Sequence, residues 1–143
     1  MEFYFYEKDF NQMAYTSNYI NRLQRIHSFC WRCAVVITEP GTGSTVSSPV
    51  KVCMEVDGVE VQPAKKGVNP GKGHHHLLID VDLPTDPSKR IGKDANHVHM
   101  GDGSTCKELK LGFGKHVIRA LFANDGHVPY SPAVTSTVIV NVR

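Results

Sequence analysis

Short alternating runs of apolar and polar residues fill most of this chain, and they limit the fold more than any other feature. The clearest run covers residues 50–56, where three valines and a methionine alternate with Lys51, Cys53 and Glu55. A period of two places successive side chains on opposite faces of a β-strand. From Ala34 onward, groups of Gly, Pro, Asn and Asp interrupt such runs about every 8–12 residues. Residues 34–143 are therefore predicted to form one antiparallel β-sandwich domain.

The first 33 residues follow a different pattern and are predicted to be an N-terminal extension. Apolar residues recur there at helical spacing, which predicts a helix over 17–28 whose apolar face would mediate self-association into a homo-oligomer. The start of the chain carries acids and lacks the basic segment and apolar core of a signal peptide, so these residues alone predict a cytoplasmic protein. No apolar run approaches the ~20 residues of a transmembrane helix.

The charge of the chain argues against a nucleic-acid partner. Its 143 residues include 16 basic and 14 acidic side chains, for a formal net charge of +2. Binding to nucleic acid usually requires a basic patch or stripe, and none is visible along the sequence.

Histidines are concentrated in the middle of the domain, and strand geometry makes their spacing informative. In a strand, His74 and His76 share one face and His75 points to the other, while His97 and His99 form a second H-x-H pair. Side chains two residues apart lie about 6–7 Å from each other along one strand face, so each pair can offer two imidazoles to one ion.

These histidines predict a transition-metal site. Three or four imidazole nitrogens suit zinc or copper. The predicted ligands are His74, His76, His97 and His99, with His75 or His127 as substitutes. The predicted acceptors for the outer ring N–H groups are Asp80, Asp82, Asp102 and Asp125. The alternative is a structural or adhesive module whose histidines only hydrogen-bond loops.

The four cysteines are predicted to have a structural role, not a redox or zinc-binding one. Cys30-Trp31-Arg32-Cys33 fits C-x-x-C, but it lacks both the βαβ context of a redox motif and the second C-x-x-C of a zinc ribbon. Cys53 lies on the polar face of its strand. In an oxidising compartment it is predicted to pin the extension through a disulfide to Cys30 or Cys33.

Catalytic motifs are missing from the sequence. It contains no G-x-S-x-G, no H-E-x-x-H and no Walker loop. We therefore expect a non-catalytic binding module, with a small copper redox enzyme as a further alternative.

Several separated motifs resemble known families. Residues 38–50 resemble the opening of bacterial immunoglobulin-like domains, and residues 36–143 resemble the bacterial family called domain of unknown function 4399. The motifs that carry the second resemblance are Gly71-Lys72-Gly73-His74-His75-His76, Asn96-His97-Val98-His99-Met100-Gly101, Gly114-Lys115-His116 and Asn124-Asp125-Gly126-His127. The resemblance implies an exported protein, periplasmic or extracellular, although family members typically begin with a secretion signal. The fold class expected is thus an all-β, immunoglobulin-like antiparallel β-sandwich of about 7–8 strands with a short, partly helical N-terminal extension.

A shorter stretch resembles copper–zinc superoxide dismutase. That family builds an H-x-H copper pair on a β-sandwich and follows it with a Gly-Asp turn. His97-Val98-His99-Met100-Gly101-Asp102 is similar, over six residues only.

Overall fold

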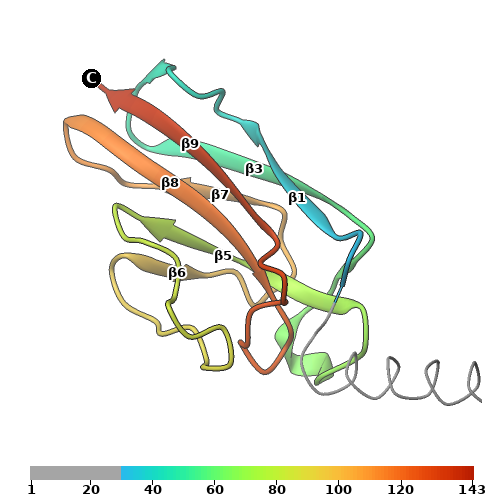
Figure 1. The fold of residues 1–143 in the computed structure, drawn as a ribbon. Helices are drawn as coiled ribbons and strands as arrows, with labels where there is room; N and C mark the ends of the chain where they lie inside the picture. The colour runs from blue at the N-terminus through green and yellow to red at the C-terminus, as the bar shows by residue number, and fades with distance from the viewer. Residues whose placement is uncertain (1–29) are drawn as a thin grey trace, which may run out of the picture.

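The protein is a sandwich of two β-sheets, seen in a computed structural model that describes residues 30–143 (Figure 1). One sheet has three strands in the order β1-β3-β7, and the other has the order β2-β9-β8-β5-β4, with β6 pairing to β5. The strands are β1 (Ala34–Glu39), β2 (Thr45–Val46), β3 (Val50–Asp57), β4 (Glu60–Val61), β5 (Lys72–Ile79), β6 (His97–His99), β7 (Cys106–Leu109), β8 (Gly114–Ala123) and β9 (Thr135–Val142). A 3-10 helix covers Ala64–Lys66.

The predicted all-β class is confirmed, with two additions. Seven strands have three or more residues, as predicted, and β2 and β4 are two-residue strands at the sheet edge. All pairings between the longer strands are antiparallel, whereas the β2–β9 and β4–β5 pairs are parallel. Within residues 30–143 there is no helix of the length and apolarity that a bilayer crossing requires. The helix predicted over 17–28 lies outside the described residues.

The core lies between the two sheets and follows the predicted alternation. Val50, Val52 and Met54 of β3 are buried, while Lys51 and Glu55 are exposed on the outer face. They pack with inward-facing residues of the second sheet, including Leu77, Ile118, Phe122 and Val140. Burial of such side chains contributes roughly 25 cal/mol for each Å² of apolar surface removed from water.

Strand β5 departs from simple alternation because it is buried on both faces. Its inner face, with Leu77 and Ile79, belongs to the core between the sheets. Its outer face carries Leu78, which packs with Ile91, Leu121 and Ala123 in a second, smaller cluster. Ile91 belongs to the 80–96 loop, so this loop covers part of the outer face of β5. The histidines of β5 therefore lie in a shielded environment on either side of the sheet.

The predicted disulfide between Cys53 and the extension is wrong. Cys53 is bonded to Cys106, and Cys30 is bonded to Cys33. Cys53 sits on the outward face of β3, as its alternation predicts, and Cys106 is exposed at the start of β7. Because β3 pairs with β7 in a register that places these two residues opposite each other, the cross-strand bond forms instead. Only the strand order, which the sequence does not give, decides between the two partners.

Candidate metal centre

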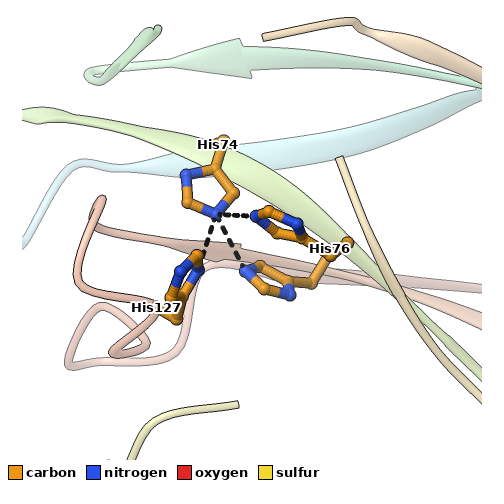
Figure 2. A group of neighbouring side chains, drawn as sticks. His74, His76 and His127 are labelled. Carbon is orange, nitrogen blue, oxygen red and sulfur yellow. Dashed lines mark hydrogen bonds between the residues drawn. The ribbon is translucent and has the colours of Figure 1, made fainter. Parts of the chain in front are cut away.

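Four histidines from three segments of the chain converge on the outer face of the larger sheet. His74 and His76 come from β5 and His127 from the loop after β8 (Figure 2). His99 comes from β6. The Nε2 atom of His74 lies 3.1 Å from Nε2 of His76, from Nε2 of His99 and from Nδ1 of His127. All four nitrogens lie within 4.8 Å of one another, so this four-histidine group could hold a metal ion.

Strand register brings three of these rings together. His76 lies opposite His99 in the antiparallel β5–β6 pair. On the other side of β5, His74 lies opposite Ala123, the last residue of β8. The chain leaves β8 at that point, so the next loop carries His127 back beside His74. Residues distant in sequence thus meet because β5 is flanked by both partners.

The loop turn that presents His127 is set by local hydrogen bonds. The side-chain oxygen of Asn124 accepts hydrogen bonds from the backbone N–H groups of Gly126 and Val128. The backbone N–H of His127 donates to the carbonyl of Asn124, and His127 itself has a positive φ of 63°. Asparagine favours such turns because its side chain substitutes for a backbone partner.

Two glycines make room for this arrangement. A Cβ atom at Gly73 would lie 2.0 Å from the carbonyl oxygen of Ala123, so only glycine lets β5 approach the end of β8 this closely. A Cβ atom at Gly101 would lie 2.2 Å from the ring of His99. The absence of both side chains therefore allows His74 and His99 to reach their positions.

Hydrogen bonding alone does not satisfy the four rings. Nδ1 of His74 donates to the carboxylate of Asp125 at 3.0 Å, since a carboxylate can only accept. The Nε2 atom of His74 then has a single lone pair, which accepts one well-aligned hydrogen bond. Three other ring nitrogens surround it at the same distance. A cation placed among them would take one lone pair from each ring.

The environment of His76, His99 and His127 favours their neutral form. Burial lowers the pKa of His76 from 6.5 to about 2, and the charges of neighbouring histidines, His74 first, act in the same direction. Burial also lowers the pKa of His99 and of His127, with the charge of His74 as the next cause for each. Neutral imidazole is the form that binds metal, so protons compete weakly for this site at pH 7.

A buried chain of polar groups supports His74 from behind. Asp125 accepts from His74 through Oδ1 and from the Nε2 amide of Gln62 through Oδ2. Gln62 also donates to the carbonyl of Gly67, and its Oε1 accepts from Asn69. This arrangement fixes the proton of His74 on Nδ1 and leaves Nε2 free for an ion, as outer carboxylates do in known metal sites.

We expect Asp125→Asn to weaken zinc binding about 10- to 100-fold. The amide keeps an oxygen for His74 but turns an NH₂ group toward the Nε2 donor of Gln62. If the Gln62 amide flipped to avoid this, its oxygen would face the carbonyl oxygen of Gly67, and the two acceptors would repel each other. The zinc dissociation constant, measured by competition with a chromophoric chelator, tests this. Asp102→Asn is the matched control, because Asp102 is exposed and its carboxylate accepts from Ser104. Equal affinities for the two variants would contradict the role of Asp125.

Two of the predicted ligands do not join the group. His75 points to the opposite face of β5, where its ring packs edge-on against Phe122 with centroids 5.3 Å apart. His97 lies opposite Leu78, one side chain farther along the strand face than His99, and its Nδ1 contacts Asp94 at 2.8 Å. The predicted H-x-H pair at 97 and 99 therefore contributes only one ring. The likeness to copper–zinc superoxide dismutase rested on His97 and His99 as a pair of copper ligands, and His97 does not join the group.

Of the four predicted carboxylate acceptors, the structure places Asp125 against a histidine of the group. Asp80 accepts from the backbone N–H of Val117 and contacts His116, and these contacts lower its pKa although burial raises it. Asp82 pairs with Arg119 at 3.0 Å. Asp80 and Asp82 follow the C-terminal end of β5, whereas His74 lies near its start. Neither aspartate therefore contacts a histidine of the group. The sequence did not identify Gln62 as part of the site, because no local pattern marks it as a neighbour of Asp125.

The comparisons with known proteins identify a family but no function. No curated protein and no solved structure matches the chain. One family model, described as domain of unknown function (DUF4399), matches residues 52–143, which is more than half of the chain and includes all four histidines of the group. The resemblance expected from the sequence is thus confirmed, and the chain belongs to this family of unknown function.

Proposed function

We propose that this protein is a metal-binding module that holds one copper or zinc ion through His74, His76, His99 and His127. The observation that carries the proposal is the convergence of three ring nitrogens on Nε2 of His74, each at 3.1 Å. A tetrahedral site with bonds of ~2.0–2.1 Å has nitrogens about 3.3 Å apart, close to these three contacts. Neutral imidazoles suit zinc and copper better than the hard cations, which prefer oxygen.

Binding or delivery of the ion fits the surroundings better than catalysis. Among residues 30–143, the carboxylate that contacts a ring of the group belongs to Asp125. Asp125 is buried and already holds His74 and Gln62, so it is not available to exchange protons with a substrate. Acid–base catalysis requires a group within reach of the reacting atoms.

An oxidising compartment such as the cell envelope is supported by the cysteines. The chain has four, and they form two disulfides. Disulfides persist in periplasmic and extracellular proteins and are rare in the cytosol. We therefore propose an envelope location, against the cytoplasmic expectation from the first residues. Thiol alkylation followed by mass spectrometry of the protein from its native host tests this, and free thiols at all four positions would contradict it.

Metal stoichiometry tests the proposed function directly. Protein purified without a polyhistidine tag, loaded with copper or zinc and then desalted, should retain about one equivalent by elemental analysis. His99→Ala and His127→Ala should lose the ion, and both residues are only half-buried, which limits damage to the fold. His75→Leu is the matched control, because His75 is a buried neighbour on β5 outside the group.

Two results would contradict the proposal. Less than ~0.1 equivalent in the wild type would leave the histidines with a structural role only. Superoxide or peroxide turnover by the copper-loaded protein would favour the redox enzyme over the binding module. Circular dichroism of each variant shows whether a lost ion reflects a lost ligand or a lost fold.

A further inference from the structure

The contacts of the His74 ring define the shape of the four-histidine group. Nε2 of His74 lies 3.1 Å from one nitrogen of each of the other three rings (Figure 2). In a square plane with bonds of about 2.0 Å, each nitrogen has two neighbours at about 2.8 Å and a third at about 4.0 Å, across the ion. In a tetrahedron, all three neighbours are equally close. The equal contacts of His74 therefore match a tetrahedron and do not match a square plane.

The two rings from β5 are restrained by burial. His74 is 0 % exposed and His76 is 1 % exposed, so neighbouring atoms enclose both side chains. Nδ1 of His74 also donates to the carboxylate of Asp125, which is itself buried. A closely packed interior leaves little room for a ring to rotate. A square plane requires one ring to move across the ion from His74, and His76 lacks the space to do so.

The other two rings are restrained by the backbone around them. His99 lies opposite His76 in the register of β5 and β6. A Cβ atom at Gly101 would lie 2.2 Å from the His99 ring, so this ring already rests against the backbone. The backbone N–H of His127 donates to the carbonyl of Asn124, which closes the turn that presents the ring. The fold, and not the ion, therefore sets the tetrahedral arrangement.

Four nitrogens complete the donor set. Within residues 30–143, the group that could hold an ion contains four histidines and neither a cysteine nor a carboxylate. Zinc in closed protein sites is almost always four-coordinate and tetrahedral, and its filled d shell gives it no geometric preference of its own. Cu²⁺ with nitrogen ligands prefers a square-planar or tetragonal arrangement. Number and arrangement of the donors thus suit zinc better than Cu²⁺.

We infer that the four-histidine group is a zinc site that discriminates against Cu²⁺. Nitrogen ligands that move freely bind Cu²⁺ more tightly than zinc, as the usual order of divalent metals states. Here the restrained rings deny Cu²⁺ its preferred geometry and leave zinc unaffected, so the order is reversed. This inference rests on the proposed function and reduces its two candidate ions to one.

Competition between the two ions tests the inference. Zinc-loaded protein without a polyhistidine tag is mixed with an equal amount of Cu²⁺, equilibrated, desalted and submitted to elemental analysis. We expect the protein to keep most of its zinc. Loss of more than half of the zinc to Cu²⁺ would show that Cu²⁺ binds more tightly and would overturn the inference. His97→Gln is the control for copper bound elsewhere, because His97 is an imidazole outside the group, and this variant should keep the same share of zinc.

Cobalt reports the geometry without depending on either affinity. Co²⁺ replaces zinc in many protein sites and absorbs strongly in the visible range when its coordination is tetrahedral. The cobalt-loaded protein should therefore show intense visible bands, and added zinc should abolish them. The weak bands of six-coordinate cobalt would overturn the tetrahedral arrangement.

The outcomes separate this inference from the proposed function. One equivalent of Cu²⁺ that displaces zinc and gives a tetragonal electron paramagnetic resonance spectrum would overturn the zinc preference and leave the metal-binding module intact. Less than ~0.1 equivalent of either ion after loading would overturn the proposed function, and the zinc preference with it.

Discussion

Zinc at about 1,000 times its dissociation constant should raise the melting temperature of this protein by about 15 °C. An ion that binds only the folded state at that concentration stabilises it by ~4 kcal/mol. For a domain near 100 residues, each kcal/mol shifts the melting temperature by about 4 °C. The four rings come from β5, β6 and the loop after β8, so unfolding of any of these segments must release the ion. Differential scanning calorimetry with and without zinc measures the shift.

Variants show whether the shift comes from the four-histidine group. His99→Ala should abolish most of it, while His75→Leu should keep it in full. In the absence of zinc, His75→Leu should melt at the same temperature as the wild type or higher. Neither ring nitrogen of His75 has a hydrogen-bond partner among the described residues, and a buried unpaired polar group costs about 1–3 kcal/mol. A zinc shift that survives His99→Ala would place the ion elsewhere.

The metal-free protein should lose stability steeply as the pH falls below about 6.5. Burial lowers the pKa of His75 to about 4 and that of His76 to about 2, with the charge of His74 as the next cause for both. In the unfolded chain both residues take up a proton near their ordinary pKa of 6.5. The unfolded state then binds more protons than the folded state, so stability is full above 6.5 and falls below it.

The expected loss is about 2–3 kcal/mol for each of these histidines by pH 4.5, because each pKa unit corresponds to 1.36 kcal/mol. Urea unfolding in a chelator between pH 7.5 and 4.5 measures it. His75→Leu should remove about half of the pH dependence, and saturating zinc should oppose the loss by occupying the rings of the group. A free energy of unfolding that stays constant between pH 6.5 and 4.5 would contradict the buried, neutral state of His75 and His76.

Local periodicity was enough to predict the class of fold and the face that each histidine occupies. The alternation of β3 correctly predicted that Val50, Val52 and Met54 are buried and that Cys53 faces outward. The same rule separated His74 and His76 from His75, and the structure agrees. These features depend on neighbours in the chain, which the sequence displays directly.

The errors concern pairs of segments. His97 was predicted as a ligand because it shares a face with His99, yet the register of β5 and β6 places it opposite Leu78. Cys53 was predicted to reach the extension, yet β7 brings Cys106 opposite it. A face is a property of one strand, whereas a register is a property of two, and strand pairing depends on turns and core packing far away in sequence.

By itself, the sequence determined that this protein is a β-sandwich with histidines gathered on two strands and one loop. Tertiary structure alone decided which of them meet. The order β8-β5-β6 places β5 between its two partners, so His99 arrives from one side and His127 from the other. The hydrogen bonds that run from Asn69 through Gln62 to Asp125 then orient His74. The physical reason is that side-chain direction is fixed locally, by the pleat of each strand, whereas convergence requires long-range pairing that no single segment encodes.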